Sequence, residues 1–379
     1  MVELLAVLFS GTSLLLTFLI WINSQKVNIK ANRWFSVFIF CIFLISLEST
    51  FIALHIEFIN DFIKNILGLT EFIIAPIFFL SVSYFIEPNR KWRKRDYLHF
   101  LFASFILFLL LLVQISDSEN SNDEISAEII KNLVLIFSLF FGLIIITYCF
   151  LSYLKLQKHQ KSIYYFSSSV EKIDLKWLQY LCIGVSIIAI FWIIDIIFNL
   201  SEANTFFDLF ISSFYLFGVF FITYYWSIQN EIFPYAKIEK KEIATIIDET
   251  NENNTNRKKI IPEEKLNQIK ADLVLMMKTK KPFLDCELNL FKLATEMNIS
   301  SHILSYVINT GFEENFFQFV NRYRIEEAKK LIIDCTMDHL SILGIGYEVG
   351  FNSKTVFNTT FKKMTGKTPS QFKKSSSDL

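Results

Sequence analysis

Seven long apolar stretches fill the first 228 residues of this 379-residue chain, and a polar tail follows them. About 20 apolar residues are needed to cross the hydrocarbon core of a bilayer, and each stretch is close to that length or longer. Seven buried helices of a soluble protein are an improbable alternative in a chain of this size. The sequence therefore predicts an all-α protein that begins with a seven-helix transmembrane bundle in contact with a lipid bilayer. The predicted spans are residues 4–22, 34–56, 62–86, 97–115, 129–154, 178–200 and 206–228.

Basic residues gather in alternate loops between these stretches. Lys26, Arg93 and Lys161 represent the first, third and fifth loops, whereas the fourth loop has five acids and no base between residues 116 and 128. Lysine and arginine favour the cytoplasmic side of a membrane. The alternation predicts an N-terminus outside, seven crossings of the inner (cytoplasmic) membrane and a C-terminus inside. Glu3, without a basic segment before the first stretch, argues against a cleaved signal peptide.

Four ionisable residues lie inside or at the end of predicted spans: Glu48, His55, Glu71 and Asp195. Charge in lipid is costly, so such side chains usually face the interior of a bundle. At about 1.5 Å per helical residue, the three acids fall in the outer half of the membrane. Two interpretations stay open. The acids either hold helices together through hydrogen bonds, or they line an outward-facing pocket for a cation, a proton or an unknown small ligand.

The polar tail begins with a linker, residues 229–261, whose segment NENNTNRKK has no apolar periodicity. Pro262 and the two acids after it suit the first turn of a helix, predicted over residues 262–280. One face of that helix would carry Leu266, Ile269, Leu273 and Met276. This face could pair with a second copy of the chain, making a homodimer, or pack on its own domain.

A helix–break–helix pattern occurs twice in residues 281–379, once on each side of a long helix predicted over about 315–334. Ser300 and Ser353 stand at the same point of the two copies and suit helix N-caps. The N-termini of these two helices could also meet a phosphate. A second helix of this kind fits the major groove, and two copies on a rigid helix could enter grooves about 34 Å apart. The outward residues are predicted to be Ser301, His302, Ser305 and Tyr306, then Lys354, Thr355, Asn358, Thr359 and Lys362.

Three segments give this tail a family resemblance: LATEMNIS, FFQFVNRYRIEEAKKLI and HLSILGIGYEVGFNSKTVFNTTFKKMTGKTPSQFKK. Residues 283–374 resemble the DNA-binding domain of AraC/XylS-type transcription regulators. The resemblance implies two helix-turn-helix units joined by one helix, and binding to double-stranded promoter DNA, usually with activation. RNA polymerase is then a further partner to consider.

Carried over by position, the resemblance assigns roles to two sets of residues. The base-reading residues would be Ser301, His302, Ser305, Tyr306, Lys354, Thr355, Asn358 and Thr359. The phosphate-binding residues would be Ser300, Arg322, Ser353, Lys362 and Lys363. The chain departs from the family at Thr359, where arginine is common, and it lacks the soluble β domain often found there. Residues 281–379 hold 12 basic and 11 acidic residues, so only modest non-specific DNA affinity is expected.

Other functional classes find little support. The chain has neither HExxH nor GxSxG, and its tail has no glycine-rich nucleotide loop, so we expect no enzyme activity. The five cysteines lack CxxC spacing and are interpreted as packing residues, with no metal or cofactor. A transporter or receptor whose tail binds DNA or protein in a secondary role remains the alternative function.

Overall fold

The computed structural model describes residues 2–22, 28–55, 61–88, 90–105, 124–171, 173–198, 205–229, 261–334 and 340–377. Within these ranges every regular element is helical, with one isolated β-bridge between Ser167 and Asn289. The chain forms two compact units. Unit 1 comprises Met1–Gln157 and Leu175–Phe233, and unit 2 comprises Lys158–Asp174 and Pro234–Leu379. The sequence had suggested one domain over residues 1–228, so the inclusion of residues 158–174 in unit 2 is a difference.

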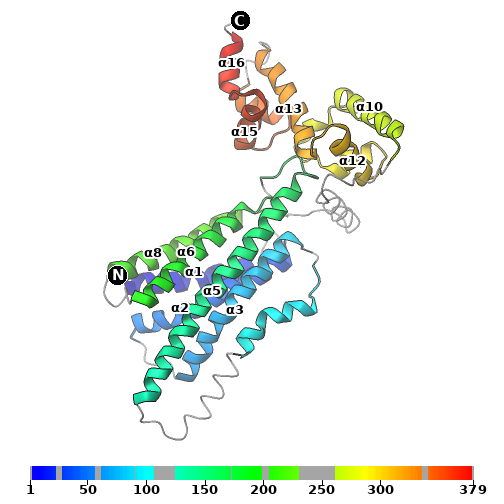
Figure 1. The fold of residues 1–379 in the computed structure, drawn as a ribbon. Helices are drawn as coiled ribbons and strands as arrows, with labels where there is room; N and C mark the ends of the chain where they lie inside the picture. The colour runs from blue at the N-terminus through cyan, green and yellow to red at the C-terminus, as the bar shows by residue number, and fades with distance from the viewer. Residues whose placement is uncertain are drawn as a thin grey trace. The chain divides into compact units, whose positions relative to one another are not determined.

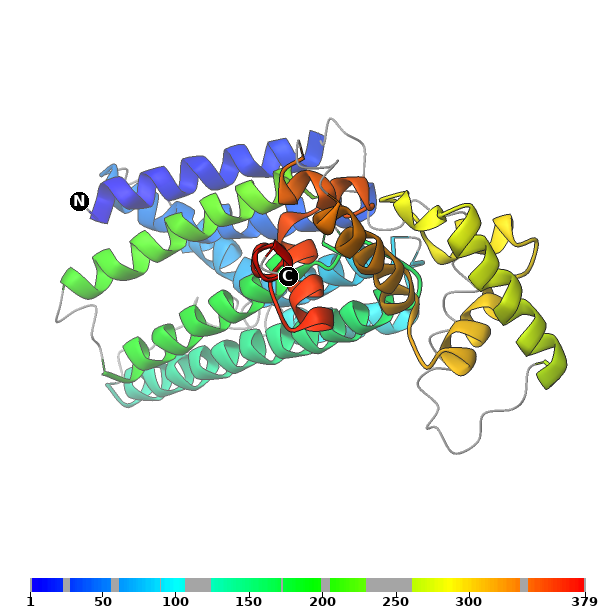
Figure 2. The same ribbon diagram turned by 90° about the horizontal axis from the view of Figure 1, so that it is seen from above.

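Unit 1 is a bundle of long helices that run side by side (Figures 1 and 2). Helix α2 packs between α1 and α3, and α8 packs on α1 and α6. Among its described residues, five helical segments are long and apolar enough to cross a membrane, and α3 adds the shorter apolar segment Thr70–Ile86. The helices are α1 (Val2–Ile22), α2 (Ile29–Ala53), α3 (Asp61–Ile86), α5 (Glu124–Ile163), α6 (Lys176–Phe198) and α8 (Thr205–Ser227).

Six of the seven predicted spans coincide with these helices. The exception is the fourth predicted span along the chain. The span predicted at 97–115 begins in a 3-10 helix, η1 (Lys94–Phe100), and its residues 106–115 lie outside the described part of the chain. The exact count of seven is therefore not confirmed. Helix α5 is also longer than predicted: its 40 residues extend about 60 Å, roughly twice the hydrocarbon thickness of a bilayer.

The bundle exposes large apolar side chains on its outer surface. Phe18, Phe150 and Phe217 are 57%, 59% and 64% exposed. In the apolar window of α8 only 11% of the residues are buried inside the structure. Large apolar side chains exposed on several helices are typical of surfaces that meet lipid or a partner.

Unit 2 is built from short helices around one longer helix, α13 (Phe316–Ile333). Figure 1 shows α13 between α12 and α15, and it contacts α14 and α16 as well. Before it come α10 (Glu263–Thr279), η2 (Pro282–Leu284), α11 (Leu290–Glu296) and α12 (Ser301–Gly311). After it come α14 (Ile342–Glu348), α15 (Lys354–Thr365) and α16 (Pro369–Ser377).

Local sequence fixes where these helices start. The side chains of Asn289, Ser300, Asn315, Ser341 and Ser353 each accept a hydrogen bond from the backbone N–H three residues later. Each therefore satisfies one N–H that the first helical turn leaves without a partner. The predicted caps at Ser300 and Ser353 are confirmed.

The helix predicted at 262–280 packs on its own domain. Ile269 of α10 and Val307 of α12 share one buried cluster, with Leu266 packed against it. Met277, rather than Met276, is the buried methionine. This contact supports the second of the two roles left open by the sequence, because the apolar face of α10 is covered within the chain.

Candidate nucleic-acid interface

Helix α15 has a polar outer face and an apolar inner face. Lys354, Thr355 and Thr359 are exposed and Asn358 is partly buried, while Phe357 and Phe361 are buried in the domain core. The predicted orientation of this helix is confirmed; its contact with bases stays a prediction. Lys362 and Lys363 are exposed in its last turn, where they could reach a DNA backbone.

Two glycines allow the turn before α15 to form. Gly350 has φ +95°, and a Cβ there would meet the carbonyl oxygen of Phe283 and lie 3.0 Å from Arg324 Nε. A Cβ on Gly346 would lie 2.8 Å from the ring of Phe357. Both positions therefore exclude larger residues: one because of backbone conformation and crowding, the other because α14 and α15 approach closely.

The outer face of α12 differs from the prediction. Ser301 and Ser305 are buried, at 4% and 5% exposure, although both were expected to face outward. Residues 301, 304, 305 and 308 form an i, i+3, i+4, i+7 set, so the two serines lie on the same stripe as Leu304 and Ile308. Ser305 also accepts a hydrogen bond from Asn309, at 3.2 Å. Neither serine is available to read bases in this conformation.

The other two predicted readers of α12 are partly buried. Tyr306 packs against the cluster shared by α10 and α12, so much of its ring serves the core. His302 lies at the first turn of the helix, next to the N-terminal N–H groups. The first helix-turn-helix unit therefore offers fewer outward polar side chains than the second helix-turn-helix unit.

Among the predicted phosphate contacts, Arg322 is already engaged. Its guanidinium makes three hydrogen bonds of 2.9–3.1 Å to the carboxylate of Glu314 and lies over the rings of Phe319 and Tyr323. The hydrogen bonds to Glu314 raise the pKa of Arg322 above its ordinary value. Binding a phosphate would require Arg322 to exchange Glu314 for DNA. The hydroxyls of Ser300 and Ser353 cap helices, and their contact with phosphate stays a prediction.

One residue without a predicted site role proves central to the domain: Arg324 of α13. Its side chain is only 1% exposed. Burial lowers the pKa of Arg324 to about 10, so the guanidinium remains charged at neutral pH. In the sequence, Arg324 stood out only as part of the segment FFQFVNRYRIEEAKKLI that carries the resemblance, and nothing in that segment predicts its burial.

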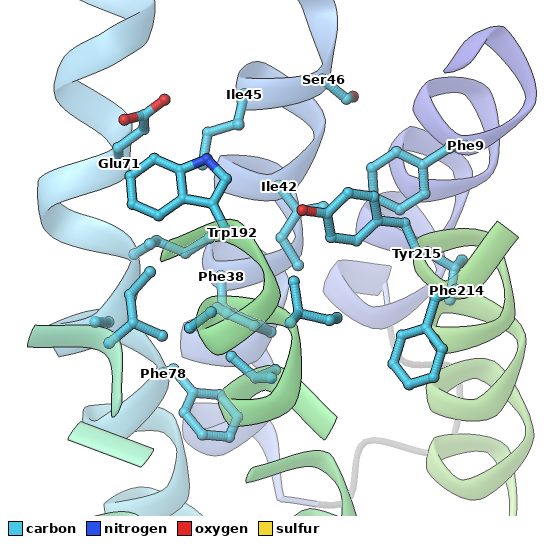
Figure 3. A pocket seen from close by; sticks show the side chains of 18 of the residues that line it. Phe9, Phe38, Ile42, Ile45, Ser46, Glu71, Phe78, Trp192, Phe214 and Tyr215 are labelled. Atoms are coloured by element: carbon cyan, nitrogen blue, oxygen red, sulfur yellow. The ribbon is translucent and has the colours of Figure 1, made fainter. Parts of the chain in front are cut away.

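Unit 1 contains a cavity of about 590 Å³, lined by residues from α1, α2, α3, α5, α6 and α8. Its walls are mostly apolar and aromatic. Figure 3 shows the Glu71 carboxylate beside the indole of Trp192, with the ring of Tyr215 across the cavity. Tyr215 stacks on Phe9 with ring centres 5.4 Å apart.

Of the four ionisable residues predicted to form a pocket, Glu71 lines the cavity. Glu71 and Asp195 both act electrostatically on Tyr215. His55 is exposed just after the end of α2 with φ +53°, and neither His55 nor Asp195 lines this cavity, so their part in a pocket stays a prediction. The side chain of Glu48 lies outside the described part. Within the described residues, no three His, Cys, Asp or Glu side chains are grouped to hold a metal ion.

Comparison with known proteins concerns the C-terminal part of the chain. A family model described as a helix-turn-helix domain matches residues 293–375. An uncharacterized HTH-type transcriptional regulator in the cgkA 5′ region of Pseudoalteromonas carrageenovora is 37% identical over 84 residues, which cover 22% of this chain and 37% of that protein. No solved structure matches the chain. Residues 293–375 therefore form an AraC-type helix-turn-helix DNA-binding domain.

Proposed function

We propose that this protein is a membrane-embedded transcription regulator that binds promoter DNA sequence-specifically and activates transcription in response to a signal sensed by unit 1. The observation that carries the membrane part is the apolar outer surface of the bundle. Exposing side chains such as Phe150 and Phe217 to water would cost free energy, whereas exposing them to lipid would not. The loop charges support an N-terminus outside and the DNA-binding domain in the cytoplasm.

The DNA-binding part is tested with the full chain in lipid nanodiscs. Fluorescence anisotropy is measured on DNA from upstream of its own gene and its neighbours, with competitor DNA and at two salt concentrations. We expect Lys354→Ala with Asn358→Ala to weaken specific binding at least about tenfold, since each good base contact contributes about 1–3 kcal/mol. Lys329→Ala is the matched control. It removes one positive charge, as Lys354→Ala does, but from α13, where Lys329 pairs with Glu326. Equal binding by both variants would contradict the assignment of α15 as a recognition helix.

The cavity of unit 1 is the proposed signal site. Its apolar and aromatic walls suit a largely apolar molecule, and Glu71 opposite Tyr215 suits a cationic or hydrogen-bond-donating group on it. We use tetraphenylphosphonium, an apolar cation, as the probe. Its binding should weaken at least about fivefold in Glu71→Gln. Glu263→Gln, at the exposed start of α10, should leave binding unchanged.

The same cavity favours one second function, transport of a small molecule with incidental DNA binding by the tail. Reconstituted liposomes distinguish the two functions. Saturable flux of the probe through the purified protein, together with the absence of specific DNA binding, would favour the transporter. Binding without flux, together with specific DNA binding, would favour the regulator.

A further inference from the structure

The loop between two candidate spans is built into the DNA-binding unit. Residues 164–171, named here the strap, follow α5 and precede α6, and they belong to unit 2. Phe166, Ser167, Ser168 and Val170 of the strap are buried. A connecting loop normally runs over the surface, because its backbone polar groups need water. This one is buried, so its polar groups must find their partners within the protein.

The backbone of the strap satisfies the starts of two helices. The Phe166 carbonyl accepts from the Leu290 N–H, at 2.9 Å, and the Tyr164 carbonyl accepts from the Phe317 N–H, at 3.0 Å. Leu290 begins α11, and Phe317 is the second residue of α13. First-turn N–H groups have no partner within their own helix, so the strap supplies partners that the domain lacks without it. Tyr164 also packs edge-to-face on Phe317 with ring centres 4.9 Å apart.

Ser168 ties the strap to the segment before α11. Its N–H and its hydroxyl both donate to the Leu288 carbonyl, at 3.3 and 2.6 Å. The neighbouring Ser167 forms the β-bridge with Asn289, the N-cap of α11. These contacts join residues about 120 positions apart in the sequence, as the separation of Ser168 and Leu288 shows.

Arg324 connects the strap to the segment before the first helix-turn-helix unit and to the turn of the second. A guanidinium has five N–H donors, and all five have partners here. The carbonyl oxygen and the hydroxyl of Ser168 accept two of them, at 3.2 and 3.0 Å. The carbonyls of Phe283 and Asp285, before the first unit, accept two more at 2.8 Å, and Asn321 accepts the fifth at 3.2 Å.

The turn of the second helix-turn-helix unit contacts the same guanidinium. The guanidinium carbon of Arg324 lies 5.6 Å from the centre of the Phe351 ring. The missing Cβ of Gly350 leaves room for Arg324 Nε. The side chain thus contacts the segment before α11, the turn before α15 and the strap at once.

We propose that the strap is a positioning element of the DNA-binding domain, which through Ser168 and Arg324 holds the two helix-turn-helix units at the mutual angle required by the operator. This inference rests on the proposed function. The strap contacts the starts of α11 and α13 and leaves the exposed face of α15 uncovered. A seated strap therefore favours DNA binding rather than blocking it. Since α5 and α6 lie on either side of the strap in the chain, a displacement of α5 against α6 would be passed through the strap to both helix-turn-helix units.

The test compares three variants of the full chain in nanodiscs of phosphatidylethanolamine and phosphatidylglycerol. Ser168→Ala removes one acceptor of Arg324 and one donor to Leu288. Ser162→Ala is the matched control, because in the described part of the chain the Ser162 hydroxyl donates to the Lys158 carbonyl of its own helix. The third variant replaces residues 164–171 with eight glycine and serine residues. The operator is first selected with the natural chain from a random-sequence DNA library.

Two readouts separate a positioning role from general damage. Hydrogen exchange should quicken at Leu290 and Phe317 in Ser168→Ala and in the replacement variant, and stay unchanged in the Ser162→Ala control. Affinity is measured on the operator and on a derivative with one base pair, about 3.4 Å, inserted between the parts bound by α12 and α15. We expect Ser168→Ala to bind the operator about tenfold more weakly, as for a lost hydrogen bond to a charged group, and to discriminate less against the insertion.

The outcomes are distinct. Natural affinity and natural discrimination in both Ser168→Ala and the replacement variant would overturn the inference while leaving the proposed function intact. Failure to select any operator with the natural chain would overturn the proposed function and this inference with it. If the replacement variant does not fold, Ser168→Ala against Ser162→Ala decides alone.

Discussion

At the scale of single residues, Arg324 is a buried cation whose hydrogen-bond partners are all uncharged. Three are backbone carbonyls, from Ser168, Phe283 and Asp285, and the others are the Ser168 hydroxyl and the Asn321 amide oxygen. A buried charge is tolerated only when its hydrogen bonds are complete. The fixed, planar geometry of the guanidinium achieves this, which an ammonium group with three donors cannot.

Replacing Arg324 by lysine should therefore destabilise unit 2 although the charge is kept. At least two of the five acceptors would lose their partner, and we expect a loss of about 3 kcal/mol in the free energy of local unfolding. Hydrogen exchange of the α13 amides in the full chain measures it. Lys329→Arg, at a partly exposed position of the same helix, is the control, expected within about 0.5 kcal/mol of the natural chain. Natural protection in Arg324→Lys would contradict the role given to the guanidinium.

Gly350 and Gly366 both have positive φ, at +95° and +78°, but only Gly350 is crowded. Gly366→Ala should cost about 1 kcal/mol from backbone strain alone. Gly350→Ala adds a clash with the Phe283 carbonyl and should cost clearly more, and it should also weaken DNA binding because α15 follows this turn. Protection of α14 and α15 amides against exchange compares the two variants. Equal losses would mean that the crowding relaxes without cost.

At the scale of elements, α13 is fastened to the segments around it by ion pairs as well as packing. Glu327 bonds to Lys281, just before η2, at 2.5 Å and to Lys330 at 3.1 Å. The hydrogen bond from Lys281 lowers the pKa of Glu327 below its ordinary value of 4.5. A lowered carboxyl pKa means that the folded state favours the ionised form.

This link should make the stability of unit 2 depend on acid. Because the folded pKa is lowered, the contribution of Glu327 is present above pH 4.5 and is lost as the pH falls through the lowered value. Both partners are partly exposed, so we expect less than about 1 kcal/mol at pH 7. Glu327→Gln should therefore be less stable than the natural chain at pH 7, and this difference in stability should shrink as the pH falls through the lowered pKa, measured by hydrogen exchange at pH 7 and in acid. A difference that grows on acidification would contradict the assignment.

At the scale of the whole molecule, the chain combines an apolar bundle with a DNA-binding domain. Helix α5 runs unbroken from Glu124 to Ile163, and its residues belong to unit 1 up to Gln157 and to unit 2 from Lys158. A bilayer covers only about 20 residues of such a helix. Part of α5 must then lie outside the hydrocarbon core if the helix crosses a membrane, and the strap follows its C-terminal end.

The proposed orientation can be measured in cells. In a Cys286→Ser background, which removes an exposed native thiol, Asp117→Cys should react with a membrane-impermeant maleimide in intact cells. Lys354→Cys should react only after lysis, because the loop charges predict that α15 lies in the cytoplasm. Labelling of Lys354→Cys in intact cells would mean that the orientation is opposite to the proposed one. The DNA-binding domain would then lie outside the cell, away from its DNA.

Sequence alone was sufficient for features that depend on neighbouring residues. The long apolar helices of unit 1 follow from runs of apolar residues, and the caps at Ser300 and Ser353 follow from serine's ability to bond the N–H three residues later. The alternation of Phe357 and Phe361 with Lys354 and Thr355 likewise predicted which face of α15 is buried. In each case the physical cause lies within one or two helical turns.

Tertiary structure decided the features that depend on distant residues. Ser301 and Ser305 look polar in the sequence, but their helix turns them toward the stripe of Leu304 and Ile308. Glu71 and Asp195, from α3 and α6, both act electrostatically on Tyr215 of α8, which no local pattern of the sequence indicates. Ser168 and Arg324 are 156 positions apart, and no local pattern marks either as the other's partner. Their bond exists because burial leaves a charged group no water to bind, so that the fold itself must supply each acceptor.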